Sequence, residues 1–596
     1  MKRQEALVYL ILALIIANAA YYGFTHYEGP SVYGDDPNYL YLASSLLKGT
    51  YIMNPGYIFS LRVMQFAPIA MFYAILGVHT YSASAWDIFS YLGTIIVVFL
   101  FGRFFYNDKA GLFAAFTISI FPLLTKFAVT TGEDPPLMFV CSLAILMLLY
   151  GRSSHKPKYY MASGLLLVAA WLISYEAGVI LAFILVLSIY ETAKRFLHHR
   201  KHFRNMLISG FCSLKEDIAK SRYMDIYRKA RHLYALIGKQ ASVFLVLGVI
   251  IGFMLTFIFS AQYSNSGPYV TITRNLNFYS KIGSSVNGLP TIPTSNVNTA
   301  TLNATLKTLG FYPNDMFPYH IFALLGLLLG GHMNFGQFLN TININIFGIG
   351  TLTEFGVSFY IVVLAIIVLL IARERRALFV GLWFAFMFLF LEFGPMSAGI
   401  SLDPLKINYV LAYRLGRFLI ITIPAASVLV GMAFARLTEF KKLYFMIPSI
   451  LLVICLLAIM YFNNTATSTF WYYWQYYPES ISIQAGRFIR YDSNATASTL
   501  VYTEAFFNNA VVPYTGSNMP EYIGDPSTSN LVFEINNTTS CSTFDNHSYV
   551  IWHGPPHCSN WINVFNVSTP KGIPEYFIEY ETPMLPYVPT NVYYVK

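Results

Sequence analysis

Charged residues are scarce in this chain. Asp, Glu, Lys and Arg make up 11% of its 596 residues, against about 25% in an average soluble domain. Hydrophobic residues make up 56%, and they recur in runs close to the roughly 20 residues that a helix needs to cross a bilayer. This composition excludes a soluble globular protein and predicts an integral membrane protein.

The sequence also lacks a glycine-rich phosphate-binding loop, so no nucleotide-binding fold is expected. Cysteine is rare, with five residues in the whole chain. Cys541 and Cys558 share the C-terminal tail, where an oxidising exterior would allow them to form a disulfide. Two free thiols are the alternative, because the sequence does not define the pairing.

The net charge of +9 would suit a nucleic-acid partner, but the distribution of the charge argues against one. Lys and Arg cluster in short segments between apolar runs, most densely at 194–239, which is the pattern of cytosolic loops. The N-terminus carries Lys2 and Arg3 and is therefore expected in the cytosol. The C-terminus is expected outside, and no nucleic-acid partner is expected.

Hydropathy and charged flanks predict about 11 transmembrane helices. They are expected at 7–24, 86–104, 110–127, 135–150, 159–174, 177–193, 240–260, 353–371, 377–392, 413–434 and 443–462. External loops are expected at 25–85 and 261–350. Two shorter apolar pieces, 64–78 and 317–331, are expected to lie on the membrane surface, because counting them as spans would place 194–239 outside.

Two domains follow from this reading. Residues 1–462 are expected to form an all-α polytopic membrane domain that includes the two external loops. Residues 463–596 are expected to form a small extracytoplasmic α/β domain. In this second domain Glu479–Tyr491 has helical spacing, and strand-like runs follow it at the end of the chain. These runs are 499–502, 530–533 and 548–552.

N-glycosylation sequons, Asn-x-Ser/Thr, fall in the segments that the charge argument places outside. They are centred on Asn303, Asn463, Asn494, Asn536, Asn537, Asn546 and Asn566. Together with the predicted spans they indicate a multi-pass protein of the cell membrane. The endoplasmic reticulum membrane is the alternative location.

The first candidate site is the acidic pair Asp35-Asp36, which follows the first apolar run and precedes Pro37. Asp35 fits the N-cap of a helix, and proline fits the first turn. Capping needs only one carboxylate, and two adjacent ones repel each other unless a cation or a reaction uses them. A functional site is therefore favoured over a plain acidic cap.

A second acidic pair, Glu133-Asp134, precedes Pro135 and Pro136 at the start of another predicted span. Topology places it on the same membrane face as Asp35 and Asp36. The two pairs together could bracket a polar substrate or share a divalent cation such as Mg²⁺ or Mn²⁺. Independent capping of two helices is the alternative.

Three further ionisable residues are expected at the outer ends of spans. Arg414 and Arg417 are spaced i, i+3 and so share one helix face. Arginine suits a phosphate ligand, and snorkelling to lipid headgroups is the alternative. Glu354, in Thr351-Leu352-Thr353-Glu354, precedes another span and is a candidate metal or substrate ligand.

The order of several motifs along residues 1–190 resembles the GT-C superfamily of membrane glycosyltransferases. It is most similar to the branch of protein O-mannosyltransferases and aminoarabinose transferases that use polyprenyl-phosphate sugars. The matching pieces are Gly34 to Ala43, Leu47-Lys48-Gly49, Gly77, Trp86 to Arg103, Ala110 to Ala115, Phe121-Pro122 and Glu133 to Leu137. The rest of the chain resembles that branch by topology only.

This resemblance implies an inverting transfer of a sugar from a polyprenyl (dolichyl)-phosphate donor to an acceptor hydroxyl on protein, lipid or glycan. Asp35 would be the general base, Asp36 its acidic neighbour and Asp134 the aspartate of the second loop. The family's His- or Lys-Pro-Pro-Leu motif is missing, and only Pro68-Ile69 stands in that region. Arg414 and Arg417 are therefore the candidates for the donor phosphate.

Two other functions stay open. The catalytic subunit of oligosaccharyltransferase is similar in the same places, and Thr351 to Glu354 resembles its Thr-x-x-Glu motif. Its Trp-Trp-Asp acceptor motif is absent, because Trp471-Tyr472-Tyr473-Trp474 has no aspartate. A transporter or flippase would need ionisable residues in the middle of spans and a repeat between halves, and the sequence shows neither.

Overall fold

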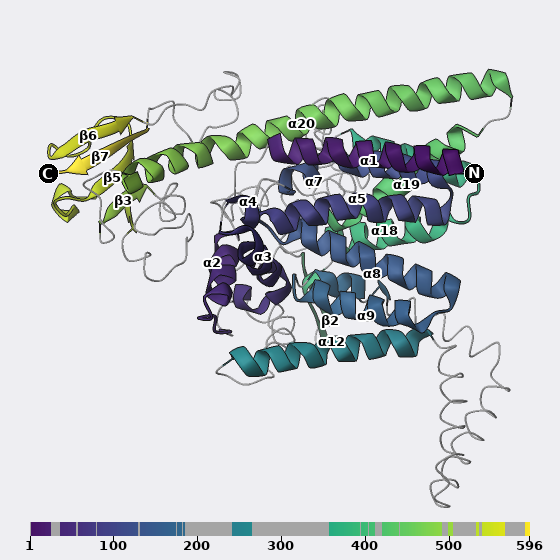
Figure 1. The fold of residues 1–596 in the computed structure, drawn as a ribbon, viewed down its shortest axis with the longest axis horizontal. Coiled ribbons are helices and arrows are strands. Elements are labelled where there is room, and N and C mark those ends of the chain that lie inside the picture. The colour runs from purple at the N-terminus through teal and green to yellow at the C-terminus, as the bar shows by residue number, and fades with distance from the viewer. Residues whose placement is uncertain are drawn as a thin grey trace, which may run out of the picture.

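The fold is a helical bundle with a small sheet beyond one end (Figure 1). The computed structural model describes residues 2–25, 36–54, 58–78, 80–128, 131–174, 176–181, 183–184, 241–264, 357–393, 395–402, 405–411, 420–439, 442–491, 499–504, 532–535, 539–566 and 590–596.

The bundle is built from long apolar helices that run side by side (Figure 1). They are α1 (Lys2–Thr25), α5 (Ala85–Phe105), α6 (Asp108–Ser119), α8 (Asp134–Ser154), α9 (Pro157–Trp171), α12 (Ala241–Tyr263), α17 (Ser358–Ile371), α18 (Ala377–Phe393), α19 (Ile423–Leu437) and α20 (Leu443–Tyr491). Shorter elements gather near one end of the bundle: α2 (Asp36–Leu47), η1 (Ile58–Leu61), α3 (Val63–Leu76), α4 (Thr80–Ala83) and α7 (Pro122–Phe127).

Six of the described helices are long and apolar enough to cross a membrane, which agrees with the predicted class of protein. They correspond to α1, α5, α8, α12, α19 with the three residues before it, and α20. The other predicted spans that the structure describes correspond to shorter helices. Residues 177–193 are described only in part, and 317–331 lie outside the described residues.

Two predicted spans have different bounds in the structure. The span expected at 110–127 is divided into α6 and α7, because Pro122 starts a new helix and proline cannot continue one. The span expected at 413–434 becomes α19 only from Ile423. Before it, strands β1 (Pro395–Leu402) and β2 (Leu405–Leu411) pair as an antiparallel hairpin.

Small residues allow the helix backbones to approach closely. A Cβ added to Gly248 of α12 would lie 2.2 Å from the carbonyl oxygen of Met161 on α9, and one on Gly164 would lie 2.3 Å from that of Leu245. A Cβ added to Gly431 of α19 would likewise lie 2.4 Å from the carbonyl oxygen of Ala110 on α6. Interfaces of small residues are typical of helices that associate in a bilayer.

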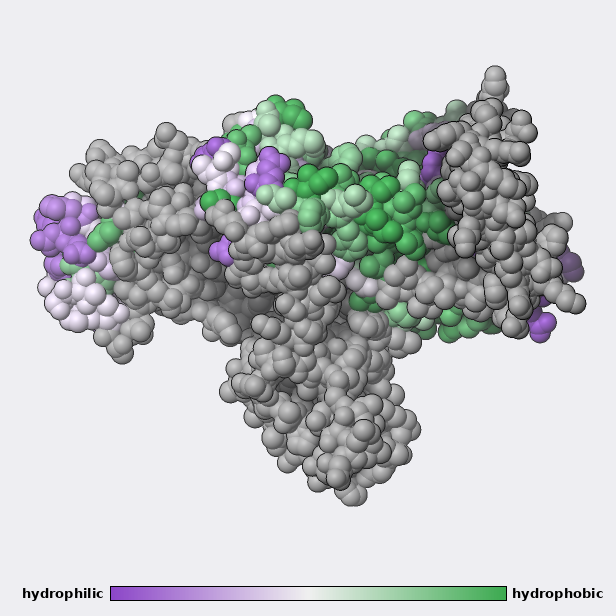
Figure 2. Space-filling view, turned by 90° about the horizontal axis from the view of Figure 1, so that it is seen from below, coloured by the Kyte–Doolittle hydropathy of each residue, from purple (hydrophilic) through white to green (hydrophobic). Residues whose placement is uncertain are grey.

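The outer surface of the bundle is apolar. Exposed large hydrophobic side chains line α1, α12 and α20. Figure 2 shows apolar residues gathered over the middle of one face and hydrophilic residues toward its two ends. This distribution is what contact with the hydrocarbon of a bilayer requires.

The C-terminal sheet confirms the three predicted strands with shifts of one or two residues. Its order is β4-β3-β5-β7-β6, with β3 parallel to β4 and β5, and β7 antiparallel to β5 and β6. The strands are β3 (Val501–Glu504), β4 (Val532–Ile535), β5 (Tyr549–His553), β6 (Trp561–Asn566) and β7 (Thr590–Val595). Cys541 and Cys558 form the disulfide that the tail composition allowed.

One continuous helix joins the two predicted domains. The 49 residues of α20 cover about 74 Å at 1.5 Å per residue, and they cross the boundary expected at 462 without a break. Ala485 and Ile489, near the end of α20, are buried against the sheet. This confirms helix at Glu479–Tyr491, and the domain boundary itself stays a prediction.

Candidate active site

The two acidic motifs meet at the end of the bundle where α2 and α3 lie (Figure 1). Asp36 begins α2 and Asp134 begins α8, and both residues are buried. The Asp36 carboxylate accepts a hydrogen bond of 2.8 Å from the backbone N–H of Thr131, three residues before Asp134. Asp35 lies outside the described residues, so its role in the site stays a prediction.

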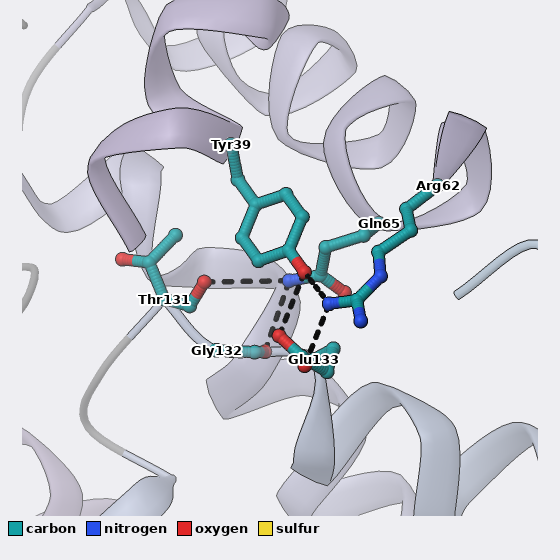
Figure 3. A network of polar contacts seen from close by, with 6 residues as sticks. All are labelled: Tyr39, Arg62, Gln65, Thr131, Gly132 and Glu133. Carbon is teal, nitrogen blue, oxygen red and sulfur yellow. Dashed lines mark hydrogen bonds and ion pairs between the residues drawn. The ribbon is translucent and has the colours of Figure 1, made fainter. Parts of the chain in front are cut away.

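Glu133 does not act as an independent cap. It occupies the N-cap position of α8, but its side chain makes no capping hydrogen bond. Instead, one carboxylate oxygen accepts a hydrogen bond of 2.7 Å from the Tyr39 hydroxyl, and the other lies 2.7 Å from the Arg62 guanidinium (Figure 3). Arg62 also donates to the Tyr39 hydroxyl. The alternative of two unrelated caps is therefore wrong for Glu133.

The loop before α8 is held from several sides. The Gln65 side-chain amide, on α3, donates to the Gly132 carbonyl at 2.9 Å (Figure 3). The Ser84 hydroxyl, next to the start of α5, lies 3.1 Å from the Thr131 hydroxyl. Together with the hydrogen bond that Asp36 accepts from Thr131, these contacts hold the loop in place against α2, α3 and the start of α5. Because Glu133 and Asp134 follow directly, their positions are fixed as well.

A core of apolar side chains supports α2 and α3. Tyr39, Leu42, Phe66 and Ile69 are buried together in it. The end of α12 joins this core through a hydrogen bond of 2.8 Å from the Met53 N–H to the Tyr263 carbonyl. The site is thus built on helices rather than on loops alone, which favours fixed positions for its side chains.

Four residues of the site were missed by the sequence analysis: Tyr39, Arg62, Gln65 and Asp87. Tyr39 is three positions after Asp36 and therefore shares its helix face, which was a usable signal. Arg62 and Gln65 flank the start of an apolar helix and carry no motif. Asp87 is a single carboxylate at the start of a predicted span, and its charge lies close enough to Asp36, Glu133 and Asp134 to interact with them.

The other candidates cannot be placed at this site. Arg414, Arg417 and Glu354 lie outside the described residues, as do Asn303, Asn494, Asn536 and Asn537. Among the described residues, the only three donor side chains that converge within 4.8 Å are those of Cys541, His557 and Cys558. Since both of these cysteines are in a disulfide, they do not offer thiolates to a metal. A divalent cation shared by the acidic motifs stays a proposal.

The sequon residue Asn463 has a structural role. It lies within α20, and its side-chain carbonyl accepts a hydrogen bond of 3.2 Å from the Val357 N–H at the start of α17. The next residue, Asn464, is fully buried and donates to the Ser358 hydroxyl at 2.5 Å. This pair of contacts connects α20 to the beginning of α17, the helix that Glu354 precedes.

We predict that Asn463 carries no glycan, because an acceptor asparagine must be presented on an accessible surface loop. Asn546 is the matched control, since it is exposed in a turn of the C-terminal domain. Glycopeptide mass spectrometry after expression in an N-glycosylating host should find Asn463 unmodified and Asn546 occupied. A glycan on Asn463 would show that α20 is not formed when the chain is modified.

Comparison with known proteins gives one family match. Residues 63–213, about a quarter of the chain, match the model of the family described as dolichyl-phosphate-mannose-protein mannosyltransferase. The expected resemblance to membrane glycosyltransferases of the GT-C superfamily is therefore confirmed over this segment, which contains α3, Asp87 and the Glu133-Asp134 pair. No curated protein matches the sequence significantly.

Solved structures show weaker similarity. The apo oligosaccharyltransferase of Archaeoglobus fulgidus is 14% identical with a TM-score of 0.45, over 91% of this chain and 69% of that one. Apo ArnT from Cupriavidus metallidurans is 13% identical with a TM-score of 0.46, over 90% of this chain and 92% of that one.

Proposed function

We propose that this protein is a membrane glycosyltransferase that moves a sugar from a polyprenyl-phosphate donor to an acceptor hydroxyl, with inversion at the anomeric carbon. The acceptor is a protein, a lipid or a glycan at the extracytoplasmic face. The lipid tail of the donor would lie in the bilayer beside the bundle. Its sugar would then reach the end of the bundle where the acidic motifs meet.

The observation that carries this proposal is the junction between the two acidic motifs. The bond from the Thr131 N–H to Asp36 and the bond from Tyr39 to Glu133 join α2 to the start of α8 across more than 90 positions of sequence. Two acidic residues that only cap separate helices would not need hydrogen bonds that connect the two helix starts. The match to the mannosyltransferase family model supports the same reading, since it includes α8.

In this mechanism Asp35 removes the proton from the acceptor hydroxyl as that oxygen attacks the anomeric carbon. The bond between the sugar and the phosphate breaks, and the phosphate leaves on the lipid. Asp36 and Asp134 are the acidic residues that accompany this base in the site. A general base of this kind contributes about 10²–10⁴-fold to the rate.

Positive charge is needed where the phosphate leaves, because negative charge develops there. Arg414 and Arg417 remain the proposed phosphate ligands. Arg62 is a cation within the described site, but its ion pair with Glu133 already uses much of its charge. A divalent cation, Mg²⁺ or Mn²⁺, held by Asp36, Glu133 or Asp134 would serve the same purpose, with Glu354 as a further proposed ligand.

Neither alternative function gains support from the structure. Oligosaccharyl transfer depends on Thr351 to Glu354, which lie outside the described residues. A transport path predicts buried charges in the middle of spans. Within the described part of the chain, the buried carboxylates instead stand at or next to the first turns of α2, α5 and α8.

The proposal is tested with the purified full-length protein in lipid nanodiscs. Radiolabelled dolichyl-phosphate-mannose is supplied with a serine- and threonine-rich peptide, and other polyprenyl-phosphate sugars form a panel beside it. Transfer of label to an acceptor from any donor of the panel is the expected result. Label that stays on the lipid with every donor, together with uptake of a labelled solute into proteoliposomes, would favour a transporter.

A further inference from the structure

Asp87 is a buried carboxylate that the mechanism above does not use. It lies in the first turn of α5, and none of its side chain is exposed to solvent. Within the part of the chain that the structure describes, neither of its carboxylate oxygens has a hydrogen-bond partner from another residue. The N-cap residue Ser84 makes no side-chain capping bond to α5, so Asp87 is not a member of a capping pair.

The surroundings of Asp87 are acidic. Asp36, Asp134 and Glu133 all act on it electrostatically, and each of the three is itself buried. The described cation of the cluster is Arg62, which is paired with Glu133 at 2.7 Å. Asp87, by contrast, has no hydrogen-bond or ion-pair partner for either carboxylate oxygen among the described residues.

Such an arrangement is unfavourable for folding. A buried carboxylate without a partner loses its hydration and gains nothing in exchange, and neighbouring carboxylates add repulsion. A serine or asparagine at this position would avoid both costs. Sites that bind ligands retain this kind of local instability because the ligand relieves it.

We propose that Asp87 is a ligand-binding residue of the site, whose carboxylate pairs with a cation that is bound there together with Asp36 and Asp134. The cation is either a divalent metal ion or the ammonium group of a substrate. Both would supply positive charge to Asp87, which has no such partner among the described residues. The described carboxylates do not converge to within 4.8 Å in groups of three, so binding of a metal ion would require them to move closer together.

The inference rests on the proposed function only for the location of the site. Binding of a cation is measured without turnover, and the two proposals can therefore fail separately. Loss of transferase activity with intact cation binding would remove the function and keep Asp87 as a ligand. Sugar transfer that proceeds without any effect of a cation would keep the proposed function and remove Asp87 as a cation ligand.

The test compares the wild type with Asp87→Asn as full-length protein in nanodiscs, stripped of metal by EDTA. Asparagine has almost the same shape but carries no charge. We expect Asp87→Asn to raise the apo melting temperature, because it removes an unpaired buried charge. We also expect it to weaken binding of the effective cation at least tenfold.

Two probes separate the sources of the cation. Mn²⁺ is followed by electron paramagnetic resonance and by its effect on the melting temperature, and glucosamine is compared with glucose by the same thermal measurement. Stabilisation of the wild type by Mn²⁺ assigns a metal. Stabilisation by glucosamine but not by glucose assigns an ammonium group.

Asp108→Asn is the matched control. Asp108 is at the other end of the bundle, next to α5, and forms a half-exposed ion pair with Arg103 at 2.9 Å. This variant should bind either probe as the wild type does. The inference is overturned if neither probe affects the wild type, if Asp87→Asn binds as the wild type does, or if Asp87→Asn lowers the apo melting temperature, which would indicate a structural carboxylate.

Discussion

Replacing Asp35 by asparagine is expected to lower sugar transfer by about 10²–10⁴-fold, the usual contribution of a general base. The amide keeps the size of the side chain but cannot accept the proton of the acceptor hydroxyl. The loss should appear in kcat, with little change in KM for the donor, because the charge is needed in the transition state. Initial rates with the donor identified in the nanodisc assay measure both constants.

Asp36→Asn is the comparison for this experiment. Asp36 accepts the Thr131 N–H through one oxygen, and an asparagine carbonyl can accept the same bond. The loop before α8 should therefore keep its position, and the rate should fall less than in Asp35→Asn. A larger loss in Asp36→Asn would exchange the two roles, and full activity in Asp35→Asn would disprove the base assignment.

Replacing Arg62 by methionine is expected to destabilise the protein by about 3–5 kcal/mol, the range for removing one partner of a buried ion pair. Glu133 is 2% exposed and Arg62 is 12% exposed. Without the guanidinium, the buried carboxylate would lose its ion pair but keep the hydrogen bond from Tyr39. The free energy of unfolding, measured by titration with SDS in mixed micelles, reports the loss.

A double variant shows whether the loss of stability comes from the buried charge of Glu133 that Arg62 no longer neutralises. Arg62→Met with Glu133→Gln removes both charges and keeps an acceptor for the Tyr39 hydroxyl, so much of the stability should return. Arg103→Met is the control, because its pair with Asp108 is half exposed and such pairs contribute about 1 kcal/mol or less. Costs that simply add in the double variant would mean that Arg62 and Glu133 are not coupled.

Parts of the candidate site were accessible from the sequence. Asp36 and Asp134 were predicted because an acidic residue followed by proline is a local signal for the start of a helix. The sidedness of the basic segments placed both on one face. Arg62 carries no such signal, because its partner Glu133 is 71 positions away and no spacing rule connects them.

Asp87 illustrates the same limit. In the sequence it is an ordinary acidic residue in the first turn of a helix, a position where carboxylates are common. Its importance depends on burial and on three other carboxylates, which stand at the starts of α2 and α8. Packing of these helices creates the excess of negative charge, and the pattern of residues along α5 contains no trace of it.

The sequence by itself determined the membrane class, most of the helices, three strands of the C-terminal sheet and the two acidic helix starts. These features depend on hydropathy, capping and short-range spacing, which act between residues close in the chain. Only the tertiary structure decided that Glu133 pairs with Arg62 and Tyr39, that Asp87 faces the same cluster, and that Asn463 and Asn464 hold α17. These contacts join residues far apart in the chain, and they form because small residues and apolar faces pack the helices in one particular arrangement.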